Sequence, residues 1–175
     1  MANTNKPIGF KVRDVEAEKP IKMLLVNGVV ATKGDVVYVA SSGLIQLTRV
    51  AGYIAGVMAS PMYNGLTGEL VTTAVSARGD YAMVYADPNA VFVGQETAYA
   101  LTDPYTTHTS ASAFDIAGTT GVQYIDAGAS TNDEVQIIGV EPDFGRADAP
   151  ISEVGAYAKV SFKFNLAKHA FGISA

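Results

Sequence analysis

The sequence contains no cysteine among its 175 residues. This absence excludes disulfides, thiolate catalysis and cysteine-based zinc or iron–sulfur sites. Because small secreted domains often depend on disulfides, it also favours assembly in a reducing cytoplasm. Lys6, Lys11 and Arg13 interrupt any apolar run near the start, so no signal peptide is expected. A chain of this length fits one domain that can bury a core without cross-links.

Charge is also scarce. Charged residues make up 17% of the chain and hydrophobic residues 49%, whereas about 25% of a typical globular domain is charged. Such a composition indicates that neighbouring molecules cover part of the surface, as in an oligomer or a shell. An ordinary β domain, in which Thr, Ser and Gly replace charged residues, accounts for it equally well.

Basic residues are absent from one long interval, between Arg78 and Arg146, where acidic residues continue to occur. This distribution predicts an acidic body with mildly basic ends, a polarity that can orient a protein on a complementary surface. The acids could equally serve only to keep the exposed face in solution. A nucleic-acid partner is not expected, because no basic patch is interleaved with aromatic residues.

Residues 50–68 carry no charge, and this stretch approaches the ~20 apolar residues that a membrane helix requires. Its second half, however, contains Pro61, Asn64, Gly65 and Gly68, which would break a helix. We therefore predict a strand followed by a turn and expect no membrane partner.

From residue 21 onward, short apolar segments alternate with turn signals such as Asn27-Gly28 at the spacing of short β-strands. The expected strands include residues 69–75 and 81–85. The best helical candidate, residues 165–171, is short. This pattern predicts a mostly-β protein, a compact β-barrel or β-sandwich with little helix, in a single domain over residues 21–175.

Residues 1–20 are predicted to form a flexible N-terminal arm, whose deletion should leave the body folded. Within the arm, apolar residues alternate at period two, which is typical of a short edge strand. The arm supplies the candidate contacts with a partner: Ile8, Phe10, Lys11, Val12 and Arg13. A frayed terminus explains the same composition equally well.

No catalytic, cofactor-binding or metal-binding residue can be assigned, and we do not expect an enzyme. His108 falls in a Thr/Ser-rich loop, His169 lies near the C-terminus, and both are expected to be exposed to solvent. The nucleophile elbow, the phosphate loop and the dinucleotide fingerprint are all missing. A Ser-His-Asp triad stays open, because its members meet only in space.

Two acidic patterns have simpler explanations than a binding site. Residues 126–134 form the densest oxygen-rich loop, but they lack the ligand spacing of an EF-hand, so we expect solvated acids there. Arg78-Gly79-Asp80 matches an integrin-binding tripeptide, yet Gly79 and Asp80 suit a tight turn, and we predict the turn. Replacing any single histidine or acid is expected to leave folding nearly intact.

Three segments together resemble the decoration (capsid cement) proteins of tailed-phage heads. They are GVVATKGDVVYVASSGLIQLT at residues 28–48, YIAGVMAS with residues 68–85 and ADPNAVFVGQ, and EVQIIGVEPD followed by GAYAKVSFKFNLAKHAFG. The likeness covers most of residues 28–172. It consists of strand-and-turn patterns and includes no catalytic signature.

The resemblance implies a structural virion protein, made in the bacterial cytoplasm and bound to the exterior of the mature capsid. There it would stabilise contacts between subunits of the major capsid protein. It also implies a homo-oligomer, with a trimer expected by analogy and a dimer or monomer as alternatives. A receptor-binding or adhesion module of a phage fibre or surface layer is the second interpretation, and a small hydrolase with an acid pair is the third.

Overall fold

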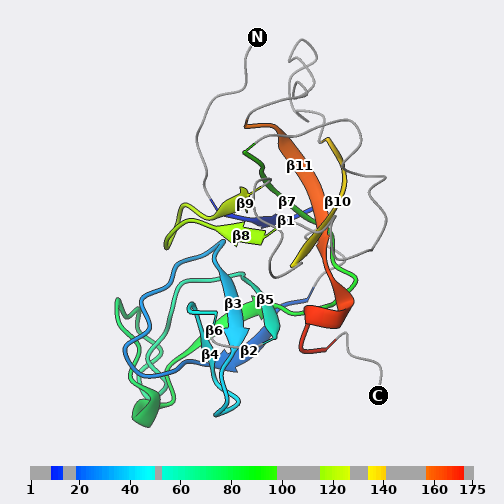
Figure 1. The fold of residues 1–175 in the computed structure, drawn as a ribbon. Helices are drawn as coiled ribbons and strands as arrows, with labels where there is room; N and C mark the ends of the chain where they lie inside the picture. The colour runs from blue at the N-terminus through cyan, green and yellow to red at the C-terminus, as the bar shows by residue number, and fades with distance from the viewer. Residues whose placement is uncertain are drawn as a thin grey trace.

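The computed structural model describes residues 9–13, 19–49, 53–97, 115–126, 134–140 and 157–171. Every pairing between the named strands is antiparallel. The described helices are single 3-10 turns, η1 (Ser76–Arg78) and η3 (Leu166–Lys168) (Figure 1). The prediction of a mostly-β fold with little helix is confirmed.

The first of two main sheets has the strand order β2-β6-β5-β3-β4. Its strands are β2 (Ile21–Leu24), β3 (Val36–Val39), β4 (Ile45–Gln46), β5 (Ile54–Met58) and β6 (Tyr81–Tyr85). The sheet curls until its outer strands meet, because Leu25, directly after β2, bridges to Ile45 in β4. We call it the curled sheet.

The second sheet has the order β1-β7-β11-β10 and is called the four-stranded sheet. Its strands are β1 (Lys11–Val12), β7 (Phe92–Gln95), β10 (Val135–Val140) and β11 (Lys159–Phe164). A separate hairpin consists of β8 (Asp115–Ala117) and β9 (Tyr124–Asp126). In Figure 1 this hairpin lies near the junction of the two sheets.

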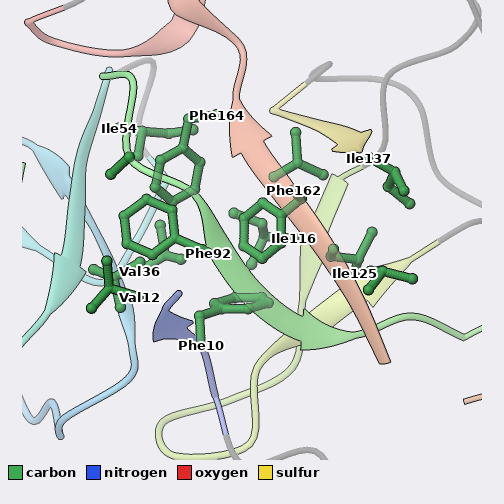
Figure 2. Packing of buried hydrophobic residues seen from close by; sticks show 14 of the residues in the cluster. Phe10, Val12, Val36, Ile54, Phe92, Ile116, Ile125, Ile137, Phe162 and Phe164 are labelled. Atoms are coloured by element: carbon green, nitrogen blue, oxygen red, sulfur yellow. The ribbon is translucent and has the colours of Figure 1, made fainter. Parts of the chain in front are cut away.

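Two hydrophobic cores follow from this arrangement, because side chains alternate between the faces of a strand. In β3, Val36 and Tyr38 contribute to a core rich in phenylalanine, shared with the four-stranded sheet (Figure 2). Val37, between them, belongs to an aliphatic core drawn from all five strands of the curled sheet. We call these the aromatic core and the aliphatic core.

Strand β5 is buried along its whole length, since Ile54 and Val57 face the aromatic core and Ala55 and Met58 face the aliphatic core. Burial on both faces explains why residues 54–58, within the uncharged run, carry no charge. The predicted strand followed by a turn is confirmed. No helix in the described ranges has the length and apolar character needed to cross a membrane.

The predicted boundary at residue 20 needs correction. Lys11 and Val12 pair with Val93 and Phe92 of β7, so the expected edge strand is present. Phe10 is 2% exposed, and its ring lies edge-on to Phe162 with the centroids 5.0 Å apart. Residues 9–13 are therefore part of the folded body, while residues 1–8 and 14–18 lie outside the described residues.

Candidate protein-binding surface

Four residues form a row across the outer wall of the curled sheet and the segments that flank the adjoining turn. Leu24 is the cross-strand partner of Tyr81. Tyr81 in turn bridges to Tyr63, and Tyr63 bridges to Leu70. Because directly paired residues in neighbouring antiparallel strands carry their side chains on the same face, all four point to one side. We call this set the apolar row.

The apolar row faces away from the aliphatic core. Its chain neighbours Leu25, Met62 and Ala82 are buried in that core, as strict alternation requires. Within the row, Leu24 is 44% exposed and Leu70 is 68% exposed. The two tyrosines are half-buried, with ring centroids 5.5 Å apart. The row is therefore an apolar surface that the aliphatic core does not use.

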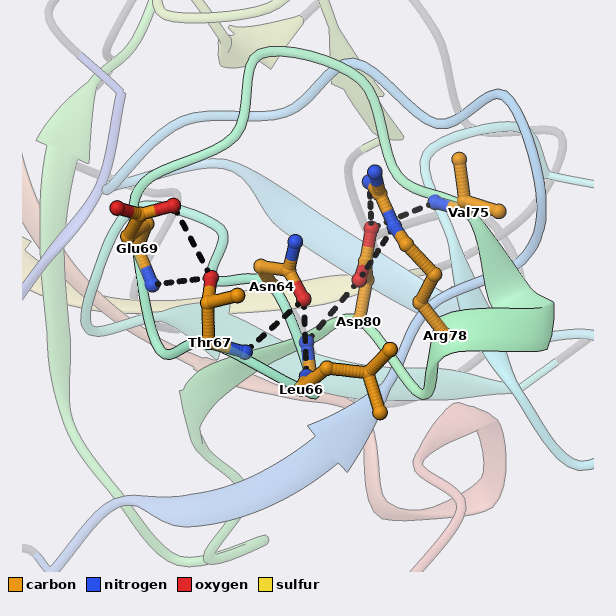
Figure 3. Close-up of polar contacts among 8 residues, drawn as sticks. Asn64, Leu66, Thr67, Glu69, Val75, Arg78 and Asp80 are labelled. Atoms are coloured by element: carbon orange, nitrogen blue, oxygen red, sulfur yellow. Dashed lines mark hydrogen bonds and ion pairs between the residues drawn. The ribbon is translucent and has the colours of Figure 1, made fainter.

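A turn between Tyr63 and Leu70 places another leucine beside the row. Leu66 is 79% exposed. The side-chain oxygen of Asn64 accepts hydrogen bonds from the backbone N–H groups of Leu66 at 2.8 Å and Thr67 at 3.2 Å (Figure 3). The backbone N–H of Gly68 donates to the Asn64 carbonyl. These bonds restrain the turn, so the exposed Leu66 is presented by an ordered backbone.

The buried carboxylate of Asp80 anchors this turn from beneath. It accepts hydrogen bonds from the backbone N–H groups of Gly65 at 3.1 Å and Val75 at 2.7 Å. It also forms an ion pair with Arg78 at 2.6 Å. The hydrogen bonds from Arg78, followed by those from the backbone, outweigh burial and lower the pKa of Asp80 to about 2.

Gly65 permits the anchor, since a Cβ atom there would lie 2.2 Å from the carbonyl oxygen of Arg78. Gly79 completes the adjacent turn at a φ of 70°. The prediction that Arg78-Gly79-Asp80 forms a turn is therefore confirmed. Because the Asp80 side chain has no solvent exposure, this tripeptide cannot present its carboxylate to a receptor.

Two charged residues lie near the apolar row. The ammonium of Lys22 lies 4.0 Å from the ring centroid of Tyr81, in a cation–π contact. Glu69, next to Leu70 in the chain, is exposed and accepts a hydrogen bond from the Thr67 hydroxyl. Partly exposed tyrosines within a polar rim are typical of surfaces that bind other proteins.

The structure separates the predicted contact residues into two groups. Phe10 and Val12 are buried in the aromatic core, so the prediction that they contact a partner is wrong. Lys11 and Arg13 are exposed on the outer face of the four-stranded sheet, where the register also places Lys159. Ile8 lies outside the described residues. None of the described contact candidates belongs to the apolar row.

The predicted acidic body is also corrected for the part of the chain that the structure describes. Most acids there are buried, and Asp126 is half-buried, which leaves Glu69 and Asp87 as the exposed ones. The exposed basic residues are Lys11, Arg13, Lys19, Lys22, Lys33, Lys159 and Lys168. Burial of acids in internal contacts thus makes the described surface basic, although the whole chain has a formal charge of −5.

The largest buried polar cluster surrounds Glu134, between the curled sheet and the β8–β9 hairpin. Its carboxylate accepts hydrogen bonds from the Tyr38 hydroxyl at 2.8 Å and the Ile116 N–H at 2.8 Å, and it forms an ion pair with Arg49. Arg49 also lies 3.9 Å from the carboxylate of Asp115. Both Glu134 oxygens are occupied by protein donors, so the cluster suits a structural role.

The pKa values in this cluster reflect the same contacts. Burial, followed by the negative charge of Glu134, raises the pKa of the Tyr38 hydroxyl, which therefore stays protonated and donates its hydrogen bond. Burial is the largest single influence on the pKa of Arg49 and lowers it, but the charges of and hydrogen bonds to Glu134 and Tyr38 together outweigh burial and raise the pKa. The cluster is thus a neutral phenol and a charged pair that join elements distant in sequence.

His169 is buried, and the prediction of an exposed histidine is wrong. Its ring lies 5.8 Å from that of Phe164 and 5.9 Å from that of Phe171, measured between centroids. Nδ1 accepts a hydrogen bond from the N–H of Phe171 at 3.2 Å, which makes Nε2 the protonated nitrogen. Burial lowers the pKa of His169 to about 4, although Asp87 opposes the shift.

Metal-binding and catalytic expectations concern several residues that the structure does not describe. His108 and residues 127–133 lie outside the described ranges. Within those ranges, no group of three or more His, Cys, Asp or Glu side chains could hold a metal ion.

No protein-family model, no curated protein and no solved structure matches this chain. The resemblance to phage decoration proteins therefore stays a hypothesis drawn from strand-and-turn patterns. The apolar row was not predicted from the sequence, because it depends on the register that joins residues 24, 81, 63 and 70.

Proposed function

We propose that this chain is a structural protein that works by binding other protein surfaces, and that it decorates the outside of a mature tailed-phage head. The observation that supports protein binding is the apolar row, with its leucines exposed and its turn held by Asp80. An exposed apolar surface on an ordered backbone loses little conformational entropy when it binds.

The head-decoration part of the proposal is supported by the sequence resemblance. A protein that binds only the expanded lattice stabilises that lattice by mass action, because it favours the state to which it binds. Many copies bound to one shell add avidity. The exposed Lys11 and Arg13 on the outer face of the four-stranded sheet would supply charged contacts with the major capsid protein.

Co-sedimentation with phage heads tests the proposal. Mature, empty heads of the phage that encodes the protein are stripped of it and mixed with increasing amounts of purified protein, in parallel with unexpanded precursor heads. We expect saturable binding to mature heads at a fixed ratio to the major capsid protein, and none to precursor heads. Absence of binding to either form would overturn the decoration role, and host surface glycans would be screened next.

Charge variants refine the same assay. The double variant Lys11→Glu/Arg13→Glu should bind mature heads more weakly than wild type. Its binding should also depend less on salt concentration. Lys168→Glu is the matched control, because Lys168 is exposed at η3 and far in sequence from β1. Equal binding by both variants would remove β1 from the contact.

A further inference from the structure

The outer face of the four-stranded sheet carries basic residues in two columns. Lys11 of β1 and the following Arg13 form one column, and Lys159 and Lys163 of β11 form the other. Side chains alternate along a strand, and Phe162, between the two lysines of β11, is buried in the aromatic core (Figure 2). All four cations therefore point away from that core. We call this set the basic face.

Strand β7 runs between the two columns and is uncharged. The register pairs Lys11 with Val93, and Val93 with Ser161 of β11. Farther along the first column, the Arg13 N–H donates a hydrogen bond to the Val91 carbonyl at 2.8 Å. Because neighbouring strands lie about 4.8 Å apart, the two columns are about 10 Å apart. The half-buried side chains of Val91 and Val93 thus form an apolar lane with cations along both sides.

The charge on this face is of one sign. None of the four strands, as the structure describes them, contains an acidic residue, and the residue of β10 opposite Lys163 is Gln136. Arg13 and Lys159 also make other interactions within the chain. Lys11, which is exposed, and Lys163, which is half-buried, are therefore the cations best placed to meet a partner.

A face with cations of this arrangement selects a partner that carries negative charge. Single-stranded nucleic acids bind to platforms of stacking aromatic side chains, but the phenylalanines of these strands all face the core. An extended peptide fits the face better. In a strand, every second side chain points the same way at a repeat of about 6.8 Å, which is also the repeat that separates Lys11 from Arg13.

We propose that the basic face binds an extended acidic segment of another protein, which lies along β7 between the two columns. Small or apolar side chains of the segment would lie over Val91 and Val93, while its carboxylates reach Lys11 on one side and Lys163 on the other. On a phage head the segment would belong to the major capsid protein, and in this respect the inference rests on the proposed function. The basic face is separate from the apolar row, which lies on the curled sheet.

Fluorescence anisotropy of a labelled peptide tests the proposal on the free protein. In the capped probe, glutamate and threonine alternate over about ten residues, so that its carboxylates share one side of an extended chain. We expect saturable binding with a dissociation constant of about 10–100 μM at low salt, weakened several-fold at about 0.2 M salt by screening. The same peptide with glutamine in place of glutamate should bind at least about tenfold more weakly.

Charge-neutral variants test which surface holds the peptide. Lys11→Gln/Lys163→Gln should bind it at least about fivefold more weakly than wild type, and Lys11→Arg/Lys163→Arg should bind it like wild type. The matched control is Lys22→Gln/Lys168→Gln, which removes the same charge from exposed positions on β2 and η3. It should stay within about twofold of wild type. Urea denaturation of each variant verifies that the fold is intact.

Three results would each overturn the proposal. They are an absence of saturable binding by wild type, equal binding of the glutamate and glutamine peptides, and equal weakening by the two glutamine double variants. Tighter binding of a single-stranded DNA of the same length than of the glutamate peptide would also overturn it, because the partner would then be a nucleic acid.

This inference and the proposed function fail separately. A protein that binds the peptide through the basic face but never binds mature heads would refute decoration and leave the basic face standing. Saturable binding to heads by a protein that does not bind the peptide would support decoration and overturn the role of the basic face.

Discussion

The two hydrophobic cores are built from different parts of the chain. The aliphatic core takes its residues from positions 23–86, which form consecutive strands and turns of the curled sheet. The aromatic core brings together Phe10, Phe92 and Phe162, and it is bordered by the buried Glu134 cluster. The first is therefore set by local alternation, whereas the second depends on segments that meet only when the whole chain folds.

Removing residues 1–13 should have the largest effect and should act on the aromatic core. It deletes Phe10 and Val12, and we expect a loss of about 5 kcal/mol, which approaches the total stability of many domains. Chemical denaturation measures this loss. Removing residues 1–8 leaves β1 in place and serves as the control. If the protein that lacks residues 1–13 is as stable as this control, residues 9–13 are a dispensable arm and do not belong to the folded body.

Hydrogen exchange on the same truncation sharpens the comparison. Amides of β11, such as Phe162, should lose protection, while those of β5, such as Ala55, should keep most of theirs if the aliphatic core persists locally. Uniform loss in both sheets would show that the two cores unfold as one unit.

Glu134→Ala should have the next largest effect, about 3 kcal/mol, which corrects the sequence-based expectation that any single acid can be replaced with folding nearly intact. It leaves the Arg49 guanidinium, the Tyr38 hydroxyl and the Ile116 N–H without their shared acceptor. Glu69→Ala is the control, because Glu69 is exposed, and it should change stability by less than about 0.5 kcal/mol. Equal effects from the two substitutions would argue that the buried cluster does not join the hairpin to the curled sheet.

A smaller, pH-dependent effect should come from His169. The pKa in the folded protein, about 4, is below the ordinary value of 6.5. The neutral ring is therefore favoured in the folded state, and the stability from this site is complete above pH 6.5 and lost as the pH falls towards 4. We expect a decrease of about 2 kcal/mol over this window. The stability from Asp80 is complete above its ordinary pKa of 3.8 and is lost only as the pH falls from there towards about 2, below this window.

His169→Gln should flatten the profile between pH 6.5 and 4, as measured by urea denaturation at each pH. His169 adjoins Ala170, whose N–H donates to the Ile54 carbonyl at 2.8 Å. Wild-type protein should thus loosen its C-terminal contact with β5 first on acidification. An unchanged slope in the variant would assign the pH dependence to other groups.

Strand alternation and turn residues were sufficient to predict the β fold, the strand within residues 50–68 and the turn at Gly79. The expected strand at residues 69–75 is absent, because Asp80 takes the Val75 N–H and Asn64 holds the preceding turn. The burial of His169 and Glu134 could not be predicted, since each is set by contacts with β-strands distant in sequence. The apolar row was missed for the same reason.

The smallest effect on stability should come from the row itself, which lies outside both cores. Leu70→Ser should change the free energy of unfolding by less than about 0.5 kcal/mol, because its side chain is 68% exposed. Met62 is the chain neighbour of Tyr63 and is buried in the aliphatic core. Met62→Ala should therefore lower the free energy of unfolding by about 3 kcal/mol in the same denaturation assay. Comparable losses from the two would mean that the row supports the fold.

The central claim is that the row acts in binding and has no part in holding the fold together. The most direct measurement is a titration of stripped, mature heads with wild type, Leu70→Glu and Leu166→Glu, with the unfolding temperature of each recorded. We predict equal unfolding temperatures, wild-type affinity for Leu166→Glu, and at least about tenfold weaker binding for Leu70→Glu, because this variant places a charge in the apolar contact. Equal binding by all three proteins would contradict the claim.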